Sequence, residues 1–161
     1  RTSRLAWSLG KWLGQASLVG VALLVGGLGA WIVAILRMAA TEGPEVVVGM
    51  LITALRTWIY SLAFVGVAVG ASHCLRSPGR ATALAMLGMV ALSVVFWLGE
   101  IGYGRGLREL WHIAQWFTPQ QQRLSLWRST PADWITATIH LTALSLAYLS
   151  AGYAVFRRRD L

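Results

Sequence analysis

WLGQASLVGVALLVGGLGAWIVAIL, residues 12–36, contains no Asp, Glu, Lys or Arg. A helix of about 20 mostly apolar residues crosses the ~30 Å hydrocarbon layer of a bilayer, so this stretch is long enough to span it. Three more such stretches follow, at residues 57–75, 81–99 and 134–156. Long uncharged runs without apolar/polar alternation favour helices over barrel strands. The sequence therefore predicts an all-α membrane protein, a single transmembrane domain whose spans lie at about 12–36, 57–75, 81–103 and 134–156.

The composition fits a membrane protein better than a soluble one. Of the 161 residues, 57% are hydrophobic and only 12% are charged, whereas roughly a quarter are charged in a typical soluble domain. The first uncharged run is too long and too rich in tryptophan and glycine for a signal peptide. The single cysteine, Cys74, excludes an internal disulfide and a cysteine-based metal site. The chain begins with Arg1 instead of methionine, as a fragment of a longer protein would.

The distribution of charge predicts the orientation. Short loops rich in Lys and Arg stay on the cytoplasmic side of a membrane. With both ends inside, the inner side holds eight basic residues and one acidic residue, Asp160, so a net charge of +8 indicates topology better than nucleic-acid binding. We expect the last three arginines to anchor the final span at anionic head groups. The inner basic residues are Arg1, Arg4, Lys11, Arg76, Arg80, Arg157, Arg158 and Arg159.

Short signals mark helix starts and a close helix contact. Proline suits the first turn of a helix, which predicts starts near Pro44, Pro78 and Pro131. Gly66 and Gly70 form a small-xxx-small face, which lets helices approach closely in lipid.

Residues 105–128 have a different character from the spans. Apolar side chains recur at helical spacing, and Thr118-Pro119 breaks the pattern. We expect an amphipathic helical hairpin on the outer side, interfacial or re-entrant, with aromatic residues at head-group level. An ordinary external loop with one amphipathic turn is the alternative. The aromatic residues of this hairpin are Trp111, Trp116, Phe117 and Trp127.

Few polar residues suggest chemistry. His73 and His140 lie toward opposite faces of the membrane, which disfavours a bis-histidine haem, and a hydrogen bond between helices is the simpler role for His140. No metal, phosphate-loop or nucleophile motif occurs in the sequence, so we expect no enzyme activity and no metal or cofactor of the chain's own. Arg56 and Glu100 bound uncharged runs on the outer side. They are expected either to pair near the outer mouth of the bundle, as a gate, or to snorkel to the interface.

The two ends of the chain resemble ABC-2 type transporter permeases. RTSRLAWSLGKWLG, residues 1–14, is similar to the family's P-x-S-R-x-x-x-x-x-G-K-x-x-G stretch before the third span, although Arg1 stands at the proline position. AVFRRRDL, residues 154–161, is similar to the family's F-x-x-R-D-[LI] ending. Residues of the two motifs that match are Ser3, Arg4, Gly10, Lys11, Gly14, Phe156, Arg159, Asp160 and Leu161.

This resemblance implies spans three to six of a six-span permease in the bacterial inner membrane. A separate ATPase subunit would hold ATP and Mg and drive transport, and a second permease subunit would complete a homodimer or heterodimer. The substrate path would follow the dimer seam, and the outer hairpin would help close its exit. Arg1, Arg4 and Lys11 would lie at the ATPase surface. The alternatives are a non-transporting accessory subunit of a larger membrane complex and a small haem-binding membrane protein.

Overall fold

The computed structural model of the chain describes residues 3–38, 44–103, 108–128 and 130–158. Within these ranges the chain is helical and contains no strand. The helices are α1 (Arg4–Met38), α2 (Pro44–Cys74), α3 (Pro78–Tyr103), α4 (Arg108–Phe117), α5 (Gln120–Arg128) and α6 (Pro131–Arg158).

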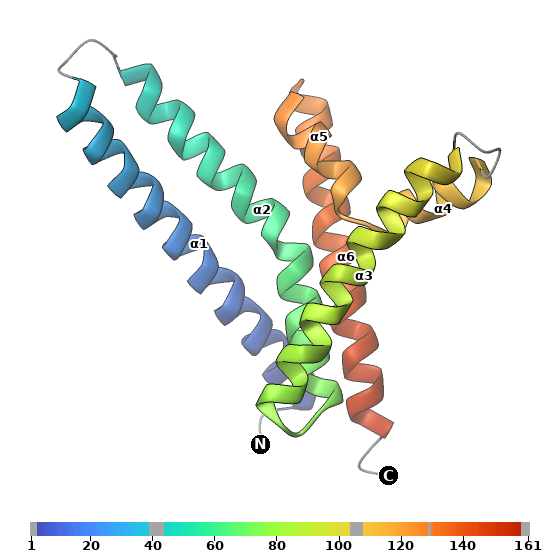
Figure 1. Cartoon of the computed structure of the whole chain (residues 1–161). Coiled ribbons are helices and arrows are strands. Elements are labelled where there is room, and N and C mark those ends of the chain that lie inside the picture. Colours follow the sequence, from blue (N-terminus) through green and yellow to red (C-terminus); the bar gives the residue numbers. More distant parts are fainter. Residues whose placement is uncertain (1–2, 39–43, 104–107, 129, 159–161) are drawn as a thin grey trace.

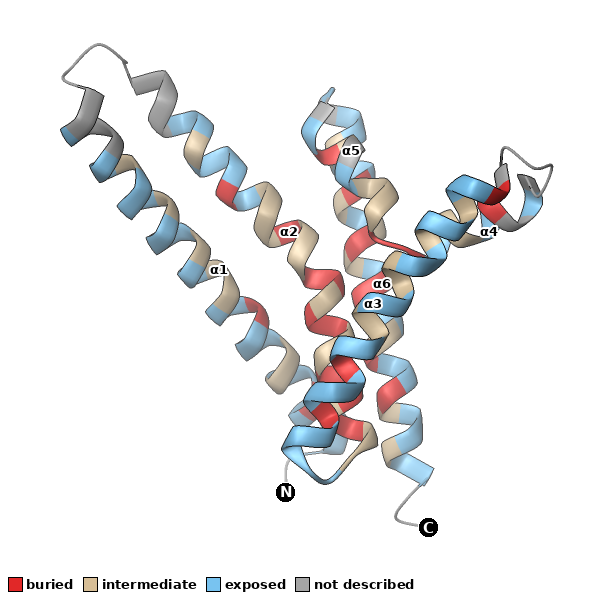
Figure 2. Cartoon of the chain, in the orientation of Figure 1, coloured by how far each residue is buried: buried red, intermediate tan, exposed pale blue. Residues whose placement is uncertain are grey.

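Four helices, α1, α2, α3 and α6, are long and apolar enough to cross a membrane. The prediction of four membrane-length helices is therefore confirmed. Most large apolar side chains on α1 and α3 are exposed, and Figure 2 shows these two helices largely in the exposed colour. Such side chains suit contact with lipid, whose hydrocarbon accepts apolar surface and satisfies no backbone polar group.

Helix α2 is the centre of the bundle. It packs most extensively on α6 and also contacts α1, α3 and α5. Figure 1 shows α1 running beside α2, while α3 leans away from both toward α4. Both ends of the described chain and the α2–α3 turn lie at one end of the molecule, called here the terminal end. Helices α4 and α5 lie at the other, the hairpin end.

The contact between α2 and α6 is close because both helices present small residues. A Cβ added at Gly70 would lie 2.7 Å from the carbonyl oxygen of Tyr148, and one at Gly66 would lie 2.7 Å from the Cα of Ser145. Gly152 faces Gly70 across the same interface. The small-xxx-small face predicted on the second span thus forms the backbone-to-backbone contact with α6.

The helix starts follow the local signals. Pro44, Pro78 and Pro131 are the first residues of α2, α3 and α6. At the start of α6, the Thr130 hydroxyl donates to the Asp133 carboxylate at 2.9 Å and accepts from the Asp133 N–H at 3.4 Å. This reciprocal contact caps the helix.

Two helices begin earlier than the uncharged runs do. Helix α1 starts at Arg4, before the uncharged run at 12–36, and α2 starts at Pro44, the predicted helix start, before the uncharged run at 57–75. The apolar span on α2 covers Val48–Cys74, so Arg56 lies inside it and does not mark its edge. Arginine is a good helix former, and a charge that interrupts an apolar run does not end the helix.

Candidate functional site

The first and last membrane-length helices meet α2 in an aromatic cluster at the terminal end. The rings of Trp7 and Phe156 are stacked, with centroids 6.2 Å apart. The His73 ring lies edge-on to both, with centroids 5.5 Å from Trp7 and 5.6 Å from Phe156. The Arg4 guanidinium carbon lies 5.9 Å from the centroid of the Phe156 ring. With Ser8, these residues are called the terminal cluster.

Hydrogen bonds fix the imidazole inside the terminal cluster. The His73 side chain is buried, and its Nδ1 lies 2.6 Å from the carbonyl oxygen of Val69. A carbonyl oxygen only accepts, so Nδ1 carries the hydrogen and donates. The other ring nitrogen, Nε2, accepts from the Ser8 hydroxyl at 2.9 Å in the neutral ring. Both ring nitrogens of the buried His73 therefore have hydrogen-bond partners, and the bond from Ser8 joins α1 to α2.

Lys11 also reaches from α1 to α2. Its Nζ donates to the Ser72 hydroxyl at 2.9 Å and lies 5.3 Å from the centroid of the Trp7 ring. Among the residues proposed to face an ATPase, the structure brings Arg4 and Lys11 close to Trp7 and Phe156, whereas Arg1 lies outside the described residues. Of the three arginines expected to anchor the chain, Arg157 and Arg158 are exposed at the end of α6, and Arg159 lies outside the described residues.

At the hairpin end, the turn between α4 and α5 is inserted between α3 and α6. Thr118 and Pro119, which form this turn, are buried. The His140 Nε2 donates to the carbonyl oxygen of Trp116 at 3.1 Å, and the Tyr148 hydroxyl donates to that of Phe117. Tyr148 lies about 25 Å along α6 from its first residue at 1.5 Å per residue. The turn therefore lies deep in the bundle, as in a re-entrant hairpin.

The inserted turn is also bonded to α3. The side-chain nitrogen of Gln120 donates to the Ser93 hydroxyl at 2.9 Å. Ser93 lies about 15 Å before the end of α3 at 1.5 Å per residue. Together with the bonds to α6, this contact holds the turn on two sides.

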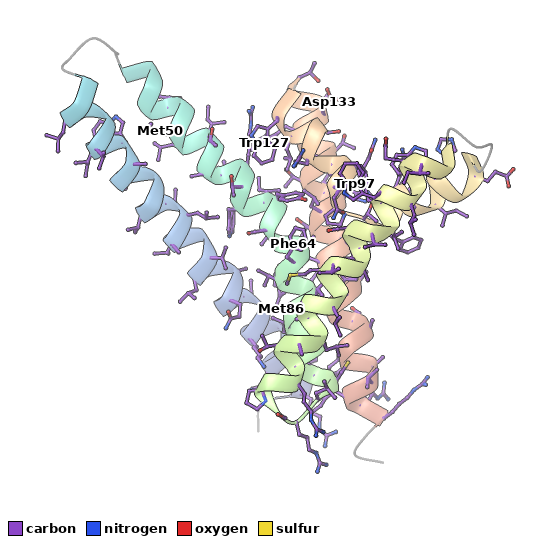
Figure 3. The ribbon with its side chains drawn as sticks, viewed as in Figure 1. Met50, Phe64, Met86, Trp97, Trp127 and Asp133 are labelled. Carbon is purple, nitrogen blue, oxygen red and sulfur yellow. The ribbon has the colours of Figure 1, made fainter. Side chains whose placement is uncertain are left out.

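The four aromatic residues of the predicted hairpin have different surroundings. Trp111 is only 6% exposed, with its ring against Gly99 and 5.3 Å from the Phe96 ring, whereas Trp116 is 68% exposed. Phe117 is exposed as well. Trp127 lies between α5 and α2 (Figure 3), with its ring centroid 6.4 Å from that of Tyr60. Trp111 and Trp127 thus attach α4 to α3 and α5 to α2.

The structure does not bring Arg56 and Glu100 together. Arg56 is half-buried, with its Nε enclosed, and Glu100 is exposed on α3. The reason is geometric, since α2 and α3 diverge toward the hairpin end (Figure 1).

One further polar relay, centred on Ser145, was not predicted from the sequence. Ser145, fully buried on α6, donates to the carbonyl oxygen of Leu62 at 2.5 Å and accepts from the Trp12 Nε1–H at 2.9 Å. It thereby links α6 to α2 and α1. A serine within an apolar run is common, so the sequence does not distinguish Ser145 from other serines. In the structure Ser145 is distinguished by facing Gly66 at the close contact between α2 and α6.

Within the described ranges, no three His, Cys, Asp or Glu side chains gather in a way that could hold a metal ion. The described residues form a helix bundle whose terminal end is basic and whose other end holds the inserted turn between α4 and α5. No protein-family model, no curated protein and no solved structure matches this chain.

Proposed function

We propose that the chain is the membrane-spanning part of the permease subunit of an ABC-2 type transporter. A separate ATPase subunit would bind at its terminal end and supply ATP hydrolysis. One observation carries the proposal: Arg4 of the first motif lies over the ring of Phe156 of the last motif. The two motifs that resemble the family come from opposite ends of the chain and share one contact surface.

Two further features support this assignment. A helical hairpin inserted just before the last span fits the family's extracytoplasmic re-entrant pair. The distribution of basic residues also fits a cytoplasmic terminal end. Arg4, Lys11, Arg76, Arg80, Arg157 and Arg158 lie there, whereas fewer, Arg37, Arg108, Arg123 and Arg128, lie toward the opposite end. The proposed location is the bacterial inner membrane, with both ends of this chain in the cytoplasm and a second permease subunit beside it.

The experiment tests coupling to an ATPase. The full-length protein that contains this chain is purified with its native partners in mild detergent, and ATP turnover of the complex is compared with that of the isolated ATPase. We expect turnover to rise in the complex. We expect Arg4→Glu to reduce this rise roughly tenfold, because a repulsive charge would replace an attractive one at the interface.

A charge reversal at the other end is the matched control. Arg123 is exposed on α5, far from the proposed ATPase surface, so Arg123→Glu should leave the stimulation unchanged. An accessory subunit would co-purify with other membrane components and stimulate no ATPase. A complex without any ATPase, or equal loss in both variants, would therefore contradict the proposed function.

A further inference from the structure

A groove runs along α2 between α1 and α3 at the terminal half of the bundle. Its volume is about 420 Å³, within the range of small-molecule sites. Lys11 and Ser72 line its end nearest the terminal cluster. The rest is lined mainly by apolar side chains, among them Val19, Phe64 and Met89. Figure 3 labels Phe64 on α2, where α3 passes in front of it. Because α1 and α3 pack mainly on α2 and not on each other, the groove has two walls and an open side.

The groove is amphipathic along its length. Val19 lies about 12 Å beyond Lys11 along α1 at 1.5 Å per residue. Over this distance the lining changes from Lys11, Ser72 and Gln15 to mostly aliphatic and aromatic side chains. The one polar residue at the far end, Ser61, donates its hydroxyl hydrogen to the carbonyl oxygen of Trp58. A ligand that fits must therefore carry a polar group at one end and an apolar chain behind it.

The polar end of the groove selects for negative charge. A lysine ammonium has three hydrogens to donate, and Ser72 accepts one of them. No carboxylate in the described part of the chain pairs with Lys11, and the described charged residues at this end, Arg4, Arg76, Arg80, Arg157 and Arg158, are all basic. An anion at Lys11 would take up the remaining hydrogens and offset this excess of positive charge.

We infer that the groove binds an anionic phospholipid of the surrounding membrane. Its phosphate accepts hydrogen bonds from Lys11, and one acyl chain lies along α2 against Phe64 and Met89. Basic pockets between transmembrane helices bind anionic head groups in this way. The inference goes beyond the proposed function, because it concerns a bound lipid and holds whether or not the chain transports anything.

Lipid titrations of the purified chain in a mild nonionic detergent test the inferred phospholipid site, and they need no ATPase. The probes are a phosphatidylglycerol and the phosphatidylcholine with the same acyl chains. We expect the phosphatidylglycerol to bind roughly tenfold more tightly, because phosphatidylcholine offers the same phosphate together with a choline cation, which the basic residues at this end disfavour. Lys11→Met should abolish this preference, and Lys11→Arg should restore it.

Two variants separate the groove from the general positive charge. Arg80→Met removes a basic side chain that is exposed at the same end and does not line the groove, so the preference should persist. Ala68→Leu fills the groove and keeps Lys11, so binding of both lipids should weaken. Circular dichroism and the unfolding midpoint identify any variant that fails to fold.

Three results would overturn the inference. Equal affinity for the two lipids would remove the role of the anion. Equal losses in Lys11→Met and Arg80→Met would indicate diffuse surface charge and no site. Binding of glycerophosphoglycerol, which lacks acyl chains, as tightly as the lipid would indicate a simple anion site and contradict the acyl groove.

Discussion

The hydroxyl of Tyr148, in the second half of α6, donates a hydrogen bond to the main-chain carbonyl of Phe117, the last residue of α4. His140 makes the same kind of bond to the carbonyl of Trp116. The last carbonyls of a helix have no partner within it and need a hydrogen-bond donor from elsewhere. Side chains of α6 therefore complete the end of α4 inside the bundle, where unsatisfied carbonyls would be costly.

Replacing Tyr148 by phenylalanine should loosen the hairpin without unfolding the bundle. The lost hydrogen bond leaves the Phe117 carbonyl unsatisfied, and we expect a loss of about 0.5–1.5 kcal/mol. Protease cleavage within the α4–α5 turn should become faster while the spans stay protected. Tyr153→Phe, on the same helix, is the control and should change neither quantity. Equal cleavage rates in both variants would show that the bond does not fasten the turn.

Gly70→Ala should separate α2 from α6. The added Cβ would lie 2.7 Å from the Tyr148 carbonyl oxygen, and backbone on backbone has no rotamer that could yield. Overpacking of this kind costs roughly 1–3 kcal/mol. Gly14→Ala is the matched control, because no atom lies within 4 Å of a Cβ there. The unfolding midpoint in a detergent titration should fall for Gly70→Ala and stay the same or rise for Gly14→Ala, and the reverse order would refute the close contact.

Ser145→Ala should weaken the contact of α6 with both α1 and α2. The variant removes the acceptor of the Trp12 Nε1–H and the donor to the Leu62 carbonyl. We expect a loss of about 1–2 kcal/mol, since two polar groups lose their partner. Ser150→Ala, at an exposed position of α6, should be neutral. Measuring the free energy of unfolding of both variants checks this. An unchanged free energy in Ser145→Ala would show that the two Ser145 hydrogen bonds do not stabilise the bundle.

Replacing each of two tryptophans on α4 by alanine should destabilise the protein to different degrees. Trp111 packs against Gly99 and Phe96, so Trp111→Ala leaves a cavity between α4 and α3 and should cost roughly 2–4 kcal/mol. Trp116→Ala removes a side chain that is 68% exposed and leaves its carbonyl in place, so the loss should be much smaller. Hydrogen exchange of the α4 amides reports the difference. Comparable exchange in the two variants would mean that Trp111 does not hold α4.

Cysteine labelling tests the proposed orientation. In a Cys74→Ser background, single cysteines replace Arg158 at the terminal end and Arg123 at the hairpin end, both exposed positions. In intact bacterial cells, a membrane-impermeant maleimide should label position 123 and spare position 158. Labelling of position 158 from outside would reverse the topology and contradict the ATPase site.

The uncharged runs predicted the number and type of the long helices because the hydrocarbon layer sets a minimum apolar length. They predicted the helix boundaries less well. At Lys11 and Arg56 the helix continues through a charge, since lysine and arginine are both good helix formers. Local turn signals did better, as the starts at Pro44, Pro78 and Pro131 show.

The contacts between helices were harder to predict than the helices themselves. Gly66 and Gly70 marked the close face of α2, because small residues are needed there. The expected pair of Arg56 and Glu100 stays a prediction, since depth along a helix does not determine whether neighbouring helices converge or diverge, and α2 and α3 diverge toward the hairpin end. Trp7, His73 and Phe156 come from three segments that are far apart in the sequence. Their contact could not be predicted from the residue pattern within any one of these segments.

The attachment of α4 through main-chain oxygens has a consequence for evolution. A carbonyl is present whatever amino acid occupies positions 116 and 117, so the tip of the hairpin can drift in sequence while its place in the bundle is kept. The donors on α6 have no such freedom, because their hydroxyl and imidazole are the side chains themselves. Diversification at the tip and constancy at positions 140 and 148 are the substitution pattern that this asymmetry favours.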